Sequence, residues 1–137
     1  MTVYLDTSVV VPLFLDDDHA PRVRAWAVSD RSIVLSAWTV TEFSSALSMQ
    51  VRLKNVTEAE RKALERAFDR WSRKGQMLEF EADMFNNARV LLQRHSRLRA
   101  PDALHLAIAL RNGVELATLD IVLRDAAVAE GMKVIDL

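Results

Sequence analysis

The chain has 137 residues, half of them hydrophobic and 27% charged, and its formal net charge is −1. This length is typical of one domain with its own core, so we expect residues 1–137 to form a single domain. The nearly balanced charge does not favour a protein that covers a long stretch of nucleic acid, because such proteins often carry a basic face. The absence of cysteine excludes disulfide bonds and thiolate metal sites.

The N-terminal residues give no sign of a targeting segment. The stretch from Met1 to Asp6 contains no basic residue and reaches an acidic residue sooner than a signal peptide would. No apolar run approaches the length that spans a membrane. We therefore expect a cytoplasmic protein that has no membrane partner.

Short apolar runs alternate with helical patterns along the chain. The longest pattern places Val40, Phe43, Leu47 and Val51 on one helical face. In chain order we expect a strand at 2–5, helices at 8–15 and 20–28, a strand at 33–35, helices at 39–54 and 57–74, a strand at 77–80, helices at 81–94 and 101–112, a strand at 115–118, a helix at 121–130 and a last strand at 133–135. This alternation predicts an α/β fold with a short central parallel sheet and helices on both faces, a three-layer α/β/α sandwich.

Four acidic residues stand near the starts of predicted helices: Asp6, Glu42, Asp102 and Asp120. A parallel sheet gathers its strand-to-helix turns at one edge, so residues far apart in the sequence can converge there. Four carboxylates in one cleft repel one another, and each pair at about 4 Å costs roughly 4 kcal/mol at an effective dielectric near 20. A divalent cation would neutralise such a cluster, and ligands that are all oxygen favour Mg²⁺ or Mn²⁺.

Each of these acids also has a purely structural interpretation. Asp6 and Asp120 would serve as helix N-caps, and Asp102 lies in a first helical turn, where the helix dipole favours an acid. Glu42 follows Thr39 by three residues, which is the spacing of a capping box. Only the joint placement of the four acids favours a shared site.

Four segments resemble the signature motifs of the PIN domain family. Asp6-Thr7-Ser8 after the first strand resembles the opening motif, and Thr41-Glu42-Phe43 resembles the second. The run Pro101-Asp102-Ala103-Leu104-His105-Leu106-Ala107 is similar to the most specific stretch of the family, and Thr118-Leu119-Asp120 is similar to the fourth motif. The order, the spacing and the total length resemble the VapC-type toxins of bacterial and archaeal toxin–antitoxin pairs, over essentially the whole chain.

This resemblance implies a Mg²⁺- or Mn²⁺-dependent endoribonuclease that hydrolyses RNA phosphodiester bonds as the toxin of such a pair. It implies that Asp6 and Asp102 are the main metal ligands, that Asp120 completes the site, and that Glu42 orients or deprotonates the attacking water. A homodimer and a cognate antitoxin protein are the implied partners. Many relatives carry a further acid just after the fourth one, whereas 121–123 is apolar here, so a second metal site stays open.

Other residues near these motifs have two interpretations each. Three hydroxyl residues would support the carboxylates or simply cap helices: Thr7, Ser8 and Thr118. Three basic residues precede Asp102 and would contact RNA or complement helix C-termini: Arg94, Arg97 and Arg99. His105, one turn after Asp102, is either a general base or a packed histidine. Three tryptophans would stack RNA bases or pack in a core or dimer interface: Trp26, Trp38 and Trp71.

Two other kinds of protein remain alternatives. A non-catalytic PIN-like adaptor that binds RNA or protein would not need its acids, so the full set of four disfavours it. A receiver domain also has an acidic pocket on a doubly wound sheet, but it needs a phosphoacceptor Asp after its third strand, and segment 80–83 suits that role poorly. Rossmann and P-loop enzymes are disfavoured because the chain has no glycine-rich phosphate loop.

Overall fold

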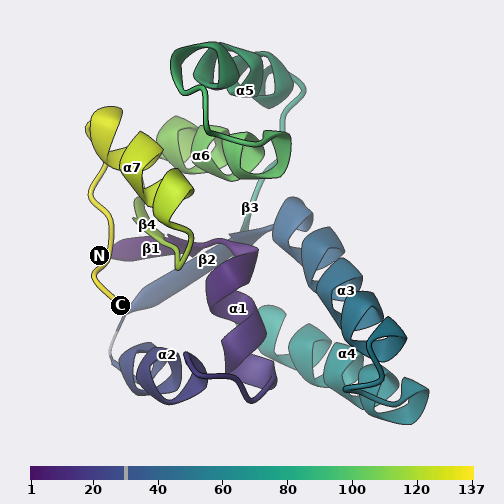
Figure 1. Cartoon of the computed structure of the whole chain (residues 1–137). Helices are drawn as coiled ribbons and strands as arrows, with labels where there is room; N and C mark the ends of the chain where they lie inside the picture. The colour runs from purple at the N-terminus through teal and green to yellow at the C-terminus, as the bar shows by residue number, and fades with distance from the viewer. Residues whose placement is uncertain (30) are drawn as a thin grey trace.

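A four-stranded parallel sheet lies at the centre of the computed structural model, which describes residues 1–29 and 31–137. The strand order is β3-β2-β1-β4 (Figure 1). The strands are short: β1 (Thr2–Leu5), β2 (Ser32–Ser36), β3 (Gln76–Leu78) and β4 (Glu115–Ala117). Because all of them are parallel, their carboxyl ends lie along one edge of the sheet, and β1 ends there between β2 and β4.

Helices cover both faces of the sheet, so the predicted three-layer α/β/α sandwich is confirmed. One face packs against α1 (Thr7–Phe14), α2 (Ala20–Ala27), α3 (Ala37–Arg52) and α4 (Glu58–Ser72). The other face packs against α5 (Asp83–Arg94), α6 (Ala100–Asn112) and α7 (Ile121–Ala129). No helix in the described part of the chain is both long and apolar enough to cross a membrane.

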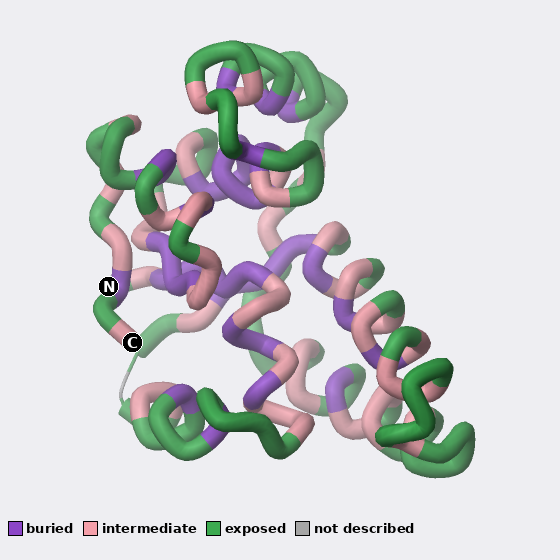
Figure 2. The backbone as a smooth tube through the Cα atoms, in the orientation of Figure 1, coloured by how far each residue is buried: buried purple, intermediate pink, exposed green. Residues whose placement is uncertain are grey.

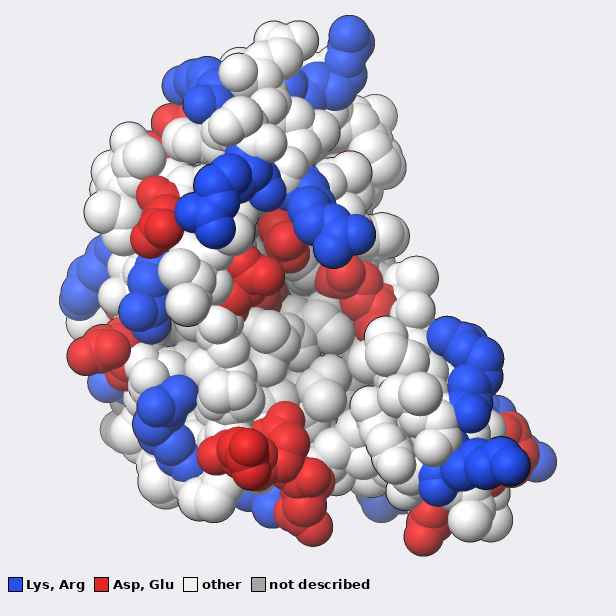
Figure 3. Space-filling model, viewed as in Figure 1, with Lys and Arg blue, Asp and Glu red and all other residues white. Residues whose placement is uncertain are grey.

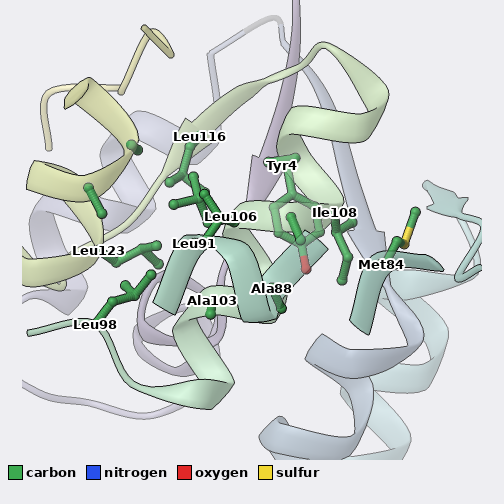
Figure 4. Close-up of a cluster of buried hydrophobic side chains, with 14 of the residues drawn as sticks. Tyr4, Met84, Ala88, Leu91, Leu98, Ala103, Leu106, Ile108, Leu116 and Leu123 are labelled. Atoms are coloured by element: carbon green, nitrogen blue, oxygen red, sulfur yellow. The ribbon is translucent and has the colours of Figure 1, made fainter. Parts of the chain in front are cut away.

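The central strand β1 divides its side chains between two hydrophobic cores. Val3 and Leu5 belong to the core under α1–α4, whereas Tyr4 belongs to the core under α5–α7. All three side chains are fully buried, and Figure 2 shows the buried colour along the middle of the sheet. In Figure 4 the Tyr4 side chain lies among the apolar residues of the second core. The rings of Phe43 and Phe68 stack in the first core with their centroids 4.3 Å apart, which joins α3 to α4.

Most predicted elements agree with the structure, but two details were wrong. The expected last strand at 133–135 is reduced to one isolated bridge between Val134 and Leu116, because β4 is only three residues long and offers little edge. The expected capping box on Thr39 is absent, since α3 begins earlier and the Ser36 side chain accepts the Thr39 backbone N–H as its N-cap. Glu42 therefore lies in the second turn of α3, and its carboxylate is not used for capping.

Candidate active site

The carboxyl edge of the sheet brings the four acids toward one place. Asp6 follows β1 as the N-cap of α1, and Asp120 follows β4 as the N-cap of α7. Glu42 projects from α3, which follows β2, and Asp102 lies in the first turn of α6. Figure 3 shows acidic side chains gathered in a hollow at the centre of this face, with basic side chains along one side of it. The three acids that lie 36 to 114 residues from Asp6 in the sequence thus share one region of space with it.

Asp6 is the most deeply buried of the four acids, with 2% of its surface exposed. Its Oδ1 accepts hydrogen bonds from Ser8 Oγ at 2.6 Å and from the Val9 N–H at 3.3 Å. Its Oδ2 accepts from Thr118 Oγ1 at 2.7 Å. Burial raises the pKa of Asp6, although these hydrogen bonds oppose that shift. Asp6 is therefore a helix cap, as its sequence context suggested, and it also keeps acceptor capacity on Oδ2.

Two hydroxyl groups connect Asp6 to the turn that carries Asp120. Ser8 Oγ donates to Asp6 and accepts the Leu119 N–H at 2.9 Å. Thr118 Oγ1 donates to Asp6 and accepts the Asp120 N–H at 3.0 Å. Each hydroxyl uses its proton toward the carboxylate and its lone pair toward the backbone. The start of α1 and the start of α7 are thereby held at a fixed separation.

Glu42 is held by Thr7 and His105 at the same carboxylate oxygen. Thr7 Oγ1 donates to Glu42 Oε1 at 2.7 Å, and His105 Nε2 hydrogen-bonds the same atom. Burial alone would raise the pKa of Glu42, but the hydrogen bonds from His105 and Thr7 help to outweigh it, and that pKa is lowered. No described residue donates to Oε2. Glu42 is therefore ionised at neutral pH and has one oxygen available to a water molecule or a cation.

Asp102 is a half-buried acid whose surroundings disfavour its charged form. Burial and then the negative charges of Asp120 and Asp6 raise its pKa to about 6. Trp38 helps to place this acid, because its Nε1–H donates to the Pro101 carbonyl oxygen at 3.2 Å and joins the start of α6 to α3. The raised pKa shows that Asp102 lies in the negative potential of the other acids.

The donor set suits a hard divalent cation. Every candidate ligand is a carboxylate oxygen, which favours Mg²⁺ or Mn²⁺ over softer metals. Among the described residues, no three acidic or histidine side chains stand close enough together to hold one ion between them. Mg²⁺ is usually held by one or two carboxylates and keeps several waters, so this arrangement fits it better than a cage made only of protein ligands.

The predicted RNA contacts differ in availability. Arg94 pairs with Glu130, with 3.2 Å between Nη1 and Oε1. Arg97 and Arg99 are exposed, and the described part of the chain offers neither of them an ion-pair partner. Arg99 is also the N-cap residue of α6, one turn before Asp102. Arg97 and Arg99 are therefore better placed than Arg94 to meet a phosphate.

The tryptophans and His105 each have two interpretations in the sequence, and the structure bears on both. All three tryptophans are partly buried against the two cores, which agrees with packing. His105 is packed too, with 1% of its surface exposed, but it bonds directly to Glu42. Tyr4 was missed altogether, although its hydroxyl lies 2.7 Å from His105 Nδ1. The available signal was a phenol in a buried strand, since a buried hydroxyl usually has a hydrogen-bond partner.

Several solved structures share this fold. FitAcB from Neisseria gonorrhoeae matches with a TM-score of 0.72 and 20% identity, over 98% of this chain and 96% of that chain. VapC20 from Mycobacterium tuberculosis, described as a sarcin-ricin loop cleaving toxin, matches with a TM-score of 0.71 and 21% identity, over 90% and 94%. A toxin–antitoxin complex from Klebsiella pneumoniae matches with a TM-score of 0.69 and 21% identity, over 98% and 96%.

The chain matches a family of sequences, although it matches no individual curated protein. No curated protein sequence matches the chain. The family model of the PIN domain matches residues 3–129, which covers all four acids and, apart from Thr2, every strand of the sheet. The resemblance of the four motifs, the parallel sheet and the gathering of the acids at its carboxyl edge agree with that match, and the chain belongs to the PIN domain family.

Proposed function

We propose that this chain is a divalent-metal-dependent endoribonuclease that acts as the toxin of a toxin–antitoxin pair. The observation that carries the proposal is the convergence of Asp6, Glu42, Asp102 and Asp120 at the carboxyl edge of a parallel sheet in a PIN domain. Ligand and active sites in open α/β sheets form at this edge. Burial, and in second place the charges of Asp120 and Asp6, raise the pKa of Asp102, and a bound cation would offset that cost.

Each acid has a distinct proposed role. Asp6, Asp102 and Asp120 would hold Mg²⁺ or Mn²⁺, directly or through water, and Glu42 would stand beside them as a further ligand or water-holding group. The bound ion would supply a nucleophilic water at neutral pH and a counter-charge for the phosphoryl oxygens. Glu42 has Oε1 fixed by Thr7 and His105, so Oε2 would orient the attacking water and accept its proton. Thr7, Ser8 and Thr118 would hold the carboxylates in place.

RNA would approach along the basic side of the acidic hollow (Figure 3). Arg97 and Arg99 would contact phosphates, while Arg94 would contribute only after leaving Glu130. Such contacts position the backbone of the nucleic acid and carry no sequence information of their own. The base sequence that is cut would therefore be selected elsewhere on the surface.

A cognate antitoxin and a second copy of the chain are the proposed protein partners. The Klebsiella structure, which shares the fold, is described as a toxin–antitoxin complex. Large apolar side chains are exposed on two neighbouring parts of the second helical layer, on α5 and α7: Phe85, Val90, Ile121 and Val128. A homodimer would cover part of this surface. Sedimentation of a monomer at about 50 µM would contradict the dimer.

Induced expression in cells tests the proposed activity. The wild-type chain should arrest growth, and mapping of new RNA 5′ ends should reveal discrete cuts. Asp102→Ala should restore growth and remove those ends at equal protein level. The alternative, a non-catalytic PIN-like adaptor that binds RNA or protein, predicts growth arrest that survives Asp102→Ala and leaves RNA intact. Arrest with no new RNA ends would refute the nuclease proposal.

A further inference from the structure

A buried hydrogen-bonded chain leads from strand β1 to Glu42. The Tyr4 hydroxyl lies 2.7 Å from His105 Nδ1, and His105 Nε2 bonds to Glu42 Oε1. The Tyr4 hydroxyl also lies 2.8 Å from Ser36 Oγ and 3.3 Å from Thr39 Oγ1. Tyr4, Ser36 and Thr39 are fully buried and His105 is 1% exposed. Water therefore cannot replace the partners of the Tyr4 hydroxyl without a rearrangement of the core.

The hydrogen-bonding capacities of these groups allow one direction for each bond when the His105 ring is neutral. An ionised carboxylate only accepts, so Nε2 of His105 must carry the proton that faces Glu42. The neutral ring then has a lone pair on Nδ1, and the Tyr4 hydroxyl, which is protonated at neutral pH like any ordinary phenol, is the donor that meets it. Ser36 Oγ can donate in turn to the Tyr4 oxygen.

His105 cannot itself reach the reacting atoms. Both of its ring nitrogens are engaged, and its side chain is almost completely buried. The role of general base is therefore excluded for His105 in this arrangement. Packing alone does not explain why the His105 ring bonds to Glu42, which is one of the four acids.

We infer that Tyr4 and His105 are positioning residues for Glu42. In this inference, Tyr4 selects the Nε2–H tautomer of His105. His105 and Thr7 together hold Glu42 Oε1, which leaves Oε2 for the attacking water. The inference rests on the proposed function, because it assigns a task to Glu42 in that reaction. A glutamate side chain has several accessible rotamers, and fixing it in advance removes an entropic cost from the reaction.

Nitrogen NMR of the histidine ring tests the first half of the inference without any activity measurement. In the intact, metal-free chain at pH 7.5, His105 is expected to carry a proton on Nε2 and none on Nδ1. Tyr4→Phe removes only the donor, so the Nδ1 resonance should move while the protein stays folded. A proton on Nδ1 in the wild-type protein would overturn the inference, whether the ring is neutral or charged.

Two substitutions of His105 test the second half. A glutamine amide nitrogen can stand where Nε2 stands, whereas an asparagine amide stands where Nδ1 stands. His105→Asn should lower kcat by roughly 10–100-fold, the usual cost of losing a residue that orients a ligand, with KM for RNA unchanged. His105→Gln should recover most of kcat. His19→Asn, at an exposed residue before α2, is the matched control and should change neither constant.

A double substitution separates positioning from packing. In a Glu42→Gln background, His105→Asn should cause little further loss, because the two residues act as a unit. Equal losses for His105→Asn and His105→Gln, each with the same fall in melting temperature, would reduce His105 to packing and overturn the inference. If the wild-type protein cuts no RNA and His105 still has the Nε2–H tautomer, the proposed function fails while the Tyr4–His105–Glu42 arrangement stands.

Discussion

Replacement of Asp102 by Asn is expected to stabilise the metal-free protein at neutral pH. Burial and the charges of Asp120 and Asp6 raise the pKa of Asp102 from 3.8 to about 6. Between those two values the folded state binds more protons than the unfolded state, so the free energy of unfolding falls as pH rises from about 4 to about 6. The penalty is complete above pH 6, and the asparagine variant does not carry it.

The size of the effect follows from three contributions. A shift of roughly two units corresponds to about 3 kcal/mol, and solvent screening of this half-buried group leaves about half of that. The charge at position 102 also favours the first turn of α6 by about 0.3–1 kcal/mol, which the variant loses. The net stabilisation is about 0.5–1 kcal/mol, or an increase of about 2–4 °C in melting temperature for a domain of this size.

Thermal unfolding in EDTA at pH 7.5 and at pH 4 measures this difference. Asp102→Asn should melt above the wild-type protein at pH 7.5, and the gap should close or reverse at pH 4, where Asp102 is protonated in the folded state. Asp69→Asn, at an exposed acid on α4, provides the matched control. A variant that melts lower than the wild-type protein at pH 7.5 would refute the repulsion, because it would make Asp102 a structural acid only.

Three further outcomes are expected. Mn²⁺ at a hundred times its dissociation constant should stabilise the fold by about 2.7 kcal/mol, and Asp102→Asn should remove most of that gain; calorimetry with no heat of binding would contradict the metal site. Ser8→Ala should cost about 1–3 kcal/mol in urea unfolding, because Asp6 and the Leu119 N–H each lose a partner; a cost below about 0.5 kcal/mol would mean that water replaces the hydroxyl. Arg97→Ala should weaken RNA binding and reduce the slope of log K against log salt by about 1; an unchanged slope would show that Arg97 does not contact phosphate.

The alternation of short apolar runs with helical patterns was enough to predict the architecture. Parallel strands buried on both faces, such as β1, have a continuous apolar sequence that is easy to recognise. The start of α3 was not predicted correctly, because Ser36 and Thr39 are both good N-caps three residues apart and only tertiary packing selects Ser36.

The sequence identified the four acids but not the contacts that hold them. The sequence placed Asp6 and Asp120 just after predicted strands, and the structure shows that these two strands, β1 and β4, are parallel neighbours. The link from Tyr4 through His105 to Glu42 joins residues separated by 101 and 63 positions. No local spacing rule connects residues at such separations. The bonds depend on how β1 packs against α6, and on burial, which removes water as a competing hydrogen-bond partner.

Cleavage of total RNA by the purified chain tests the central claim most directly. With Mg²⁺ or Mn²⁺ present, the wild-type protein and the Asp69→Asn control should cut the same RNA at the same positions. EDTA should stop cleavage, and so should Asp6→Asn and Asp102→Asn, while circular dichroism shows that both variants stay folded. Cleavage that persists in the two variants or in EDTA would contradict a nuclease centre built from these carboxylates.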